Sequence, residues 1–440
     1  MKYPSRQAAA DIITQFDVTH QQLKKVQHEA YKKLRPKPGS WNRTMVLTND
    51  VIRLKGRLDH ILEHVSGKKM NHIQPDLRSI LRIGCYELLF DDHIPDFAAI
   101  HSSVDLTKES INKKAAGLIN AVLRKILRQH ENDPNWLNKL SKQHQWLSFP
   151  AWLIKKWEKR YGKADAIKLC NTFNHPVPMF LRVNQTRMSM DNVVKSLAED
   201  SIVVEQFKPI PSFLRVLKWK KHVLMTPLFT SGVISIQDPA SAAIIYLLEP
   251  KIGETVLDVC AAPGTKSLMI AEMIGSDGTV LSSDKDYRRV EMGKLDIKRH
   301  KLKNIHWSVL DAKEDHFPIS RKILIDAPCT GTGVIGRRPD IRWRRRPGDV
   351  VAMAGLQFSI LNHISRYLLS GGTMVYSTCS LEPEENCEVV ERFLNSNRGF
   401  KLVPPYSNIP KKWVSENGFL MTSPVHHGID GMFAAKLLKI

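Results

Sequence analysis

The sequence predicts an α/β protein that ends in a doubly wound sheet domain, and three observations lead to this class. From about residue 236 onward, strand-like and helical segments alternate, which is typical of a parallel sheet covered on both faces. Residues 1–140 show helical spacing of apolar side chains, and residues 145–235 mix both patterns over short distances. The predicted architecture is therefore an all-α domain, a small α+β domain and a Rossmann-like α/β domain at 236–440.

The helical character of residues 1–140 follows from periodicity. Good helix formers fill residues 7–16, and Leu77, Ile80 and Leu81 recur at helical spacing. Because strand-like alternation is scarce in this region, we expect a helical bundle.

The middle region begins after two proline breaks, at Pro134 and Pro150. From Trp152 we expect one short helix and then mixed elements around residues 179–184. Residues 201–212 loosely alternate apolar and polar side chains as a strand would, until Pro209 and Pro211 end it. A small α+β domain is therefore expected at 145–235.

The last region alternates strands with helices. The expected strands are Thr255–Cys260, Thr279–Ser283, Ile305–Val309, Ile323–Asp326 and Thr373–Ser377. The expected helices are Thr265–Ile274, Tyr287–His300, Val350–Leu369 and Glu384–Leu394.

Positive charge is concentrated in the first half of the chain. The protein carries 65 lysines and arginines against 44 aspartates and glutamates, and residues 1–235 hold 38 of the basic and 21 of the acidic side chains. A basic front half predicts a polyanionic partner, since each neutralised phosphate releases counterions. Simple solubility is the alternative reading of this charge.

Cysteine usage and hydropathy bound the class of protein further. Six cysteines are scattered without close CxxC pairs, which argues against a zinc site and a disulfide scaffold and fits a reducing cytoplasm. No apolar run reaches the roughly 18 residues of a membrane span, and residues 1–17 lack the core of a signal peptide. We therefore expect a cytoplasmic protein without metal or membrane association.

A cofactor site is predicted at the carboxyl ends of the strands. Residues 256–266 read as a strand, a tight loop of small residues and a helix N-terminus, which bring backbone N–H groups close to a nucleotide-like ligand. Asp284 ends the next strand, where a carboxylate can hold ribose hydroxyls, and Asp311 and Asp326 follow the third and fourth strands. One such aspartate could merely cap a helix, but several in register indicate a ligand site.

A second glycine pattern is a weaker signal. Residues 331–336 match GxGxxG, but they run into Arg337, Arg338 and Pro339 rather than into a helix. We therefore do not expect a dinucleotide at this loop.

Two cysteines follow neighbouring strands of the predicted sheet. Cys329 comes after the fourth strand and Cys379 after the fifth, so both thiols should lie on the ligand-binding edge. Buried structural cysteines are the alternative. Two thiols beside a cofactor loop favour covalent chemistry.

Four motifs now make a family resemblance specific. They are Leu-Asp-Val-Cys-Ala-Ala-Pro-Gly, Asp-Ala-Pro-Cys-Thr-Gly-Thr-Gly, Arg-Arg-Pro-Asp-Ile-Arg-Trp and Ser-Thr-Cys-Ser-Leu-Glu-Pro-Glu-Glu-Asn. Over nearly the whole chain, the sequence resembles the Sun (RsmB, Fmu) family of bacterial 16S rRNA cytosine-C5 methyltransferases. Residues 119–124 resemble the NusB-like helical RNA-binding domain of that family, and residues 180–184 resemble its middle domain.

The resemblance implies the cofactor and its contacts. S-adenosylmethionine would be bound by Cys260, Ala261, Ala262, Pro263, Gly264, Thr265, Lys266, Asp284, Asp311 and Asp326. The chain departs from the family at Thr265, where a glycine is usual.

The resemblance also implies the catalytic roles. Cys379 would add to C6 of cytosine, which activates C5 toward the methyl group, and Cys329 would assist product release. Asp326 should hydrogen-bond the N3/N4 edge of the base. A paired base must be unstacked first, so a single-stranded or splayed cytosine is expected.

The arginine-rich segment 337–346 is predicted to contact RNA. Arginine forks fit phosphates, and arginine and Trp343 can stack on bases. A solvated charged loop is the alternative.

Other readings remain open from the sequence. They are methylation of another RNA such as tRNA, a DNA cytosine-C5 methyltransferase, a non-catalytic RNA-binding assembly factor, and a nicotinamide oxidoreductase based on the GxGxxG match. We favour 16S ribosomal RNA, naked or partly assembled, as the partner of a monomeric enzyme.

Overall fold

The computed structural model describes residues 4–405 and 409–440, so the first three residues of the predicted helical domain lie outside the described part. The chain forms two compact units. The first comprises Met1–Pro176 and Ile335–Arg345, and the second comprises Val177–Val334 and Arg346–Ile440. Within the described ranges, no helix has both the length and the apolar character needed to cross a membrane.

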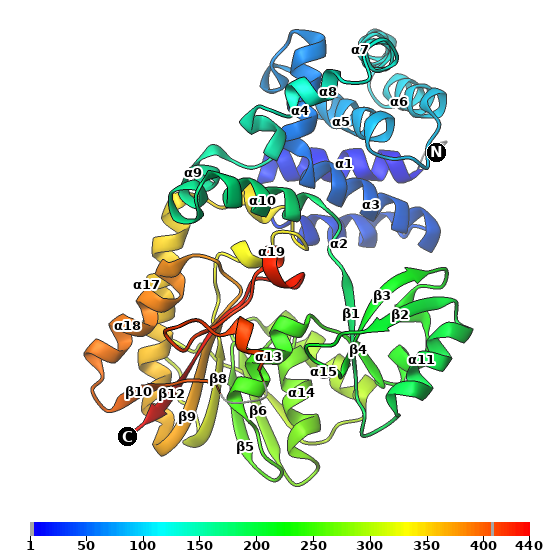
Figure 1. Ribbon diagram of the computed structural model, residues 1–440. Helices are drawn as coiled ribbons and strands as arrows, with labels where there is room; N and C mark the ends of the chain where they lie inside the picture. The colour runs from blue at the N-terminus through cyan, green and yellow to red at the C-terminus, as the bar shows by residue number, and fades with distance from the viewer. Residues whose placement is uncertain (1–3, 406–408) are drawn as a thin grey trace. The chain divides into compact units, whose positions relative to one another are not determined.

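The first unit is built from helices (Figure 1). Their bounds are α1 Pro4–Thr19, α2 Leu23–Leu34, α3 Pro38–Arg53, α4 Lys55–Ser66, α5 Pro75–Leu89, α6 Asp96–Ser110, α7 Lys113–Asn132, α8 Trp136–Leu140, α9 Ala151–Tyr161, α10 Lys163–Asn174 and α16 Ile341–Arg344. The last of these comes from a distant part of the sequence but packs within this unit.

The apolar side chains that recur at helical spacing in residues 1–140 form one apolar core. Leu77, Ile80 and Leu81 of α5 are buried together with side chains of α1, α3, α4 and α7. The long helix α7 is preceded by Asn112, whose side chain accepts a hydrogen bond from the backbone N–H of Ala115 at 2.8 Å and so caps the helix. The predicted helical bundle is confirmed.

The second unit begins with a small antiparallel sheet in the order β2-β3-β1-β4. Its elements are β1 Met179–Val183, α11 Met190–Glu199, β2 Ile202–Gln206, β3 Phe213–Trp219, α12 Pro227–Thr230 and β4 Ile234–Ile236. Strand β2 lies within the segment 201–212 where sequence alternation predicted a strand, and β1 lies in the region where mixed elements were expected.

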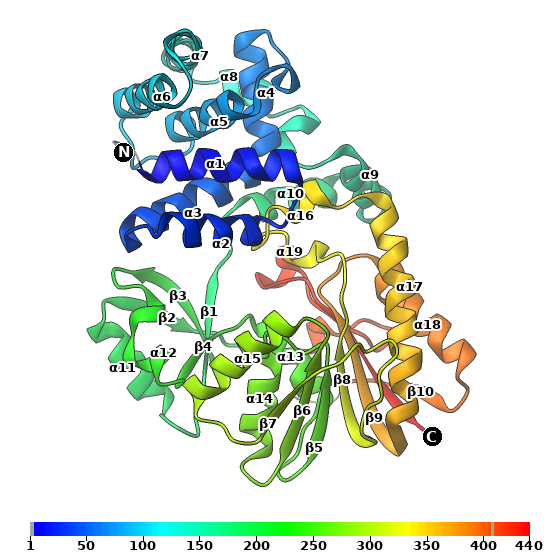
Figure 2. The same ribbon diagram turned by 180° about the vertical axis from the view of Figure 1, so that it is seen from behind.

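The rest of the second unit is a large mixed sheet in the order β10-β12-β9-β8-β5-β6-β7, with β11 paired to β12. Strands β5 to β10 of this sheet are labelled in Figure 2. Its elements are α13 Pro239–Leu248, β5 Thr255–Val259, α14 Thr265–Ile274, β6 Thr279–Asp284, α15 Tyr287–His300, β7 Ile305–Val309, β8 Ser320–Asp326, α17 Pro347–Ile364, β9 Leu368–Thr378, α18 Cys387–Ser396, β10 Phe400–Val403, β11 Leu420–Met421, α19 Pro424–His427 and β12 Phe433–Lys439. Strands β5 to β9 are parallel, whereas β12 pairs antiparallel with both β9 and β10.

Both faces of the large sheet are covered by helices. Val256 of β5 packs in the cluster formed with α13 and α14, whereas Leu257 and Val259 pack in the cluster formed with α17 and α18. Alternate side chains of a strand point to opposite faces, so a strand buried on both sides is apolar throughout. The predicted doubly wound α/β domain is confirmed.

A helix end and two strands of this domain differ from the sequence prediction. The helix expected to reach Leu369 ends at Ile364, because β9 already begins at Leu368. The antiparallel strands β10 and β12 were not predicted. Strand β12 is rich in alanine, leucine and lysine, which favour helix, but pairing with β9 over six residue pairs overrides this preference.

Candidate active site

The loop between β5 and α14 is shaped by two residues with left-handed backbone conformation, Cys260 at φ 60° and Gly264 at φ 102°. A Cβ atom on Gly264 would lie 2.7 Å from the indole of Trp307, so only glycine fits there. Thr265, where the family has glycine, is the first residue of α14 and has no positive φ. A threonine is therefore compatible with this backbone.

Asp284 ends β6 and is buried, with 5% of its surface exposed. Its Oδ2 accepts a hydrogen bond from the backbone N–H of Ala262 at 3.2 Å and lies 3.0 Å from Nη1 of Arg289. Its Oδ1 accepts from the N–H of Asp286 at 3.0 Å. The carboxylate thus joins the end of β6 to the loop after β5.

Asp311 follows β7 at the same end of the sheet as Asp284. Its Oδ1 accepts a hydrogen bond from the N–H of Lys313 at 3.0 Å, and its Oδ2 lies 3.9 Å from Nζ of Lys285. One third of the side chain is exposed, which leaves the carboxylate accessible to a ligand.

Asp258 lies inside β5 and is fully buried. Its Oδ2 accepts a hydrogen bond from Oγ of Ser267 at 2.5 Å, which ties β5 to α14. Burial, reinforced by the negative charge of Asp326, raises the pKa of Asp258 to about 7.

Lys266 pairs with Asp326 at the end of β8. Its Nζ lies 2.7 Å from Oδ2 of Asp326, whose Oδ1 accepts a hydrogen bond from Oγ of Ser377 at 3.1 Å. Burial acts to lower the pKa of Lys266, but the Asp326 carboxylate outweighs it, so the pKa is raised. The ammonium group therefore stays charged and holds Asp326 in place.

The two thiols that follow β8 and β9 lie together. The Sγ atoms of Cys329 and Cys379 are 3.2 Å apart. The hydrogen bond to Cys379, burial, and the charges of Cys379 and Glu385 raise the pKa of Cys329 well above its usual value. The Cys329 thiol is therefore held in its protonated form.

Cys260 is the third cysteine near this edge and differs from the other two. Burial and the nearby carboxylates of Asp284 and Asp326 raise its pKa. A thiol held neutral is a poor nucleophile, so Cys260 lines the loop without the reactivity of a thiolate.

The glycines of the GxGxxG match have a packing role. A Cβ atom on Gly333 would lie 1.9 Å from the carbonyl oxygen of Gly431, and the N–H of Gly333 donates to the carbonyl of Cys379 at 2.9 Å. Gly333 therefore allows a close approach to backbone of the protein itself.

The prediction that the arginine-rich segment contacts RNA is wrong for Arg342. Its side chain is fully buried within the helical unit, where Nη2 donates to the carbonyl of Phe173 at 3.1 Å. Trp343 also packs against the helical core, with Nε1 donating to the carbonyl of Ile52 at 2.8 Å. Only Arg337, Arg338 and Arg346 of this segment are exposed, which leaves them as the candidates for phosphate contact.

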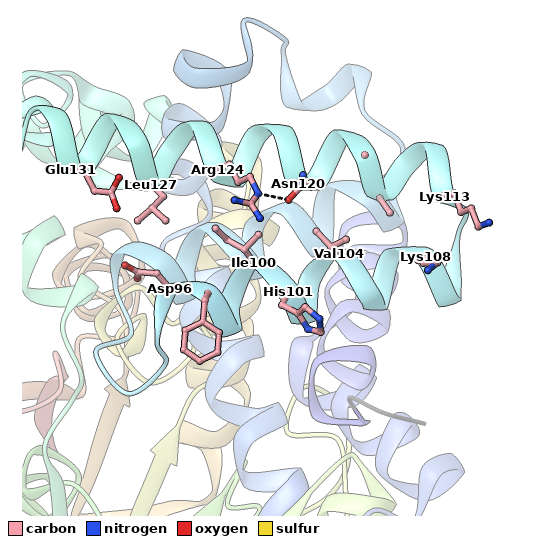
Figure 3. A pocket seen from close by; sticks show the side chains of 13 residues that line it. Asp96, Ile100, His101, Val104, Lys108, Lys113, Asn120, Arg124, Leu127 and Glu131 are labelled. Carbon is pink, nitrogen blue, oxygen red and sulfur yellow. Dashed lines mark hydrogen bonds between the residues drawn. The ribbon is translucent and has the colours of Figure 1, made fainter.

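A groove of about 940 Å³ lies between α6 and α7 of the helical unit (Figure 3). Lys108 and Lys113 lie at one end of it, and Asp96 and Glu131 lie at the other. Near its middle, Arg124 donates to Oδ1 of Asn120 at 2.8 Å. Charges of both signs therefore line this groove.

Some polar residues of the site were missed by sequence reasoning. Asp258 could have been noticed, because a carboxylate within a buried apolar strand is unusual. Arg289 and Glu385 could not be singled out from the sequence as site residues, because the adjacent Arg288 and Glu384 are of the same residue types.

Among the described residues, no cluster of three or more His, Cys, Asp or Glu is arranged to hold a metal ion.

A Rossmann-like sheet with a tight loop after its first parallel strand and carboxylates at successive strand ends defines a nucleotide-binding α/β protein. A model described as 16S rRNA methyltransferase RsmB/F matches residues 245–438. The NusB family model matches residues 3–128, and the ferredoxin-like domain of the RsmF/B methyltransferases matches residues 149–220.

Similar proteins cover nearly the whole chain. The probable ribosomal RNA small subunit methyltransferase B of Synechocystis sp. is 33% identical over 401 residues, which cover 89% of this chain and 90% of the relative. Its counterpart in Bacillus subtilis is 34% identical over 408 residues, 89% of each chain. The chain belongs to the RsmB/F family of 16S rRNA methyltransferases, and the resemblance seen in the sequence is confirmed.

Solved structures agree with this assignment. The crystal structure of PH0851 superposes with a TM-score of 0.81 at 27% identity and covers 100% of this chain and 99% of that one. A methyltransferase homolog protein from Pyrococcus horikoshii superposes with a TM-score of 0.58 at 29% identity, covering 70% of this chain and 100% of that one.

Proposed function

We propose that this protein transfers a methyl group from S-adenosylmethionine to C5 of a cytosine in 16S ribosomal RNA, through a covalent bond between Cys379 and C6 of the base. The observation that carries the covalent step is the 3.2 Å separation of the Cys329 and Cys379 sulfur atoms at the ends of neighbouring parallel strands. Two thiols this close can reach adjacent atoms of one pyrimidine ring.

The asymmetry between the thiols supports their separate roles. Because its pKa is raised, Cys329 is the less suited of the two to attack C6 as a thiolate, which leaves this role to Cys379. Once its sulfur is bonded to carbon it carries no negative charge, so one cause of the raised pKa of Cys329 disappears. Cys329 can then lose its proton to solvent and, as a thiolate, take the proton from C5. The electrons of the C5–H bond re-form the C5=C6 bond as the Cys379 sulfur leaves C6 as a thiolate.

Asp326 is suited to hold the base. It lies at the end of β8, paired with Lys266 and bonded to Ser377, and 31% of its side chain is exposed. From there a carboxylate can accept a hydrogen bond from the N4 amino group and so orient the base. Lys266 keeps Asp326 oriented during this step.

The residues of the β5–α14 loop fit a sulfonium nucleoside cofactor. The carboxylates of Asp284 and Asp311 suit ribose hydroxyls, and backbone N–H groups of residues 261–266 lie at a helix N-terminus. When bound, S-adenosylmethionine supplies an electrophilic methyl group. The chain's own contribution is to orient this group toward C5 and to exclude water.

The helical domain, expected at residues 1–140, would bind the RNA. The cationic end of the α6–α7 groove, with Lys108 and Lys113, offers phosphate contacts, and the basic excess of the first half supports this role. The small domain at 145–235 would add to the RNA-binding surface, and the domain at 236–440 would carry the chemistry. We propose a cytoplasmic monomer acting on naked or partly assembled rRNA.

The two thiols can be tested separately. With 16S rRNA and S-adenosylmethionine, Cys379→Ala should form no covalent adduct and transfer no methyl group. Cys329→Ala should still attack and methylate but release the product slowly, so that protein and RNA migrate together on a denaturing gel. Cys387→Ala, which changes a thiol outside this pair, is the control and should behave as wild type.

Two outcomes would contradict the proposal. An adduct with Cys379→Ala and none with Cys329→Ala would exchange the roles and indicate a mechanism of the DNA-enzyme type. Full methylation by both variants without any adduct would refute covalent catalysis. Bisulfite sequencing of the methylated rRNA would locate the modified cytosine and distinguish rRNA from tRNA as substrate.

A further inference from the structure

Glu385 is a buried carboxylate beside the two thiols. It ends a short 3-10 turn, Pro383–Glu385, which follows strand β9, and none of its surface is exposed. Within the described ranges no lysine or arginine forms an ion pair with it, so its charge is balanced by other means.

Four hydrogen bonds from neutral donors converge on this carboxylate. Oε2 accepts from the backbone N–H of Thr330 at 2.8 Å and from Nε2 of Gln357 at 2.9 Å. Oε1 accepts from Oγ of Ser380 at 2.6 Å and from Oγ1 of Thr330. An ionised carboxylate has about four acceptor sites, so its capacity is filled.

Two of these donors directly follow the two thiols in the sequence. Thr330 directly follows Cys329, and Ser380 directly follows Cys379. One carboxylate therefore holds the residue after each thiol, although the two residues are 50 positions apart in the chain. Gln357 adds a link, since its Nε2 also donates to the carbonyl of Pro328 at 2.9 Å.

Glu385 is itself held firmly. The hydroxyl of Tyr376 donates to the carbonyl of Glu385 at 2.6 Å, and Nδ2 of the next residue, Asn386, donates to the carbonyl of Ser380 at 2.9 Å. A buried charge is costly unless it is fully hydrogen-bonded, and a fully bonded one resists displacement. Glutamine could not replace it, because one carbonyl oxygen cannot satisfy four donors.

We propose that Glu385 is a positioning residue that fixes the separation of the Cys329 and Cys379 sulfur atoms by clamping the two loops that carry them. The catalytic consequence rests on the proposed function. Cys329 must reach C5 while Cys379 is bonded to C6 of the same ring, so a loop that drifts would leave attack possible and slow the release. The structural part of the proposal stands on the contacts alone.

The separation can be measured chemically on the whole protein. Diamide accepts two electrons and two protons from a pair of thiols, which form an S–S bond as its N=N bond is reduced. We expect wild type to form the Cys329–Cys379 disulfide, identified by peptide mapping, and Glu385→Gln to form it about tenfold more slowly. Glu388→Gln, an exposed carboxylate three residues along the chain, is the matched control and should not differ from wild type.

Two further measurements distinguish a change in the separation of the thiols from a change in thiol reactivity or in folding. Labelling of Cys379 by N-ethylmaleimide reports its reactivity, so a slower disulfide with unchanged labelling isolates a change in position. Thr330→Val, which removes one hydroxyl donor and keeps the carboxylate, should slow the disulfide less than Glu385→Gln while leaving the melting temperature nearer to wild type. It keeps the test informative if Glu385→Gln fails to fold.

With rRNA and S-adenosylmethionine, Glu385→Gln should accumulate the covalent protein–RNA adduct, as Cys329→Ala does. An unchanged disulfide rate in a folded Glu385→Gln protein, together with normal product release, would overturn the proposal. Failure of the proposed function would look different. Wild type would then methylate no cytosine, while the disulfide rates would still report whether Glu385 sets the distance.

Discussion

Nη1 of Arg342 donates a hydrogen bond to Oδ1 of Asn174 at 2.5 Å, within the helical unit. The same Nη1 donates to the backbone carbonyls of Arg53 at 3.0 Å and Ser148 at 3.2 Å, and the guanidinium stacks 4.0 Å from the ring centre of Phe149. Burial, followed by the charge of Arg53, lowers the pKa of Arg342, yet a guanidinium stays protonated in proteins. Carbonyl groups and a ring therefore solvate a buried cation.

Replacing this arginine should destabilise the helical unit. Arg342→Ala would leave several buried carbonyls without a donor and open a cavity, so we expect the free energy of unfolding to fall by roughly 3 kcal/mol. Urea denaturation would measure this decrease, and the exposed Arg338→Ala should change the free energy by less than about 0.5 kcal/mol. Unchanged stability with weaker RNA binding would instead favour a direct contact of Arg342 with RNA.

Asp284 should contribute to cofactor affinity. Asp284→Ala removes the charged acceptor at the end of β6 and is expected to weaken S-adenosylmethionine binding by about 1.5–3 kcal/mol. Arg289→Ala keeps the carboxylate and removes only its ion pair, so its effect should be smaller. Calorimetric titration would compare both with the exposed Asp277→Ala, and an unchanged affinity for Asp284→Ala would exclude Asp284 from the site.

Asp258 should make stability depend on pH. Its pKa is raised to about 7 in the folded protein, so the folded state binds the proton more tightly than the unfolded state. The stabilisation is fully present below the unfolded pKa near 4 and is lost as pH rises through 7. Between pH 5 and 8, wild type should lose roughly 2–3 kcal/mol of unfolding free energy relative to Asp258→Asn. Parallel pH curves from urea denaturation would show that Asp258 does not titrate in this range.

The cationic end of the α6–α7 groove should govern the salt dependence of RNA binding. In the full chain, changing Lys108, Lys113 and Arg124 to glutamine should lower the slope of log affinity against log salt by about 0.7 for every phosphate that is no longer neutralised. The same change at Lys251, Lys313 and Lys401 lowers the net charge equally but lies elsewhere, and should leave the slope nearly unaltered. Equal slopes for both triple variants would mean that the positive charge of α6 and α7 serves solubility.

Some helices and strand ends could be predicted from the local sequence pattern alone. The helices Thr265–Ile274 and Tyr287–His300 were predicted with their observed bounds, because apolar periodicity and flanking residues define helix ends. Neighbouring parallel strands end at one edge of a sheet, so the sequence also indicated that Cys329 and Cys379 would lie near each other.

The end of α17 and the strand β12 were decided by long-range pairing. Nothing local stops a helix at Ile364 rather than Leu369, but Ser320 and Leu368 pair across β8 and β9 and draw the chain into the sheet. Strand β12 forms in a helix-prone sequence because its backbone groups pair with β9 and β10.

By itself the sequence determined the family, the order of the domains, the tight loop after β5 and the placement of the two thiols at strand ends, because these are carried by contiguous motifs. Only the tertiary structure decided that Arg342 lies in the core of the helical unit rather than on a surface, and that Glu385 rather than Glu384 holds the two cysteine loops together. The physical reason is the same for both residues. A charged side chain is stable in the interior only when distant parts of the chain supply its hydrogen-bond partners, and those partners are not encoded in the residues beside it.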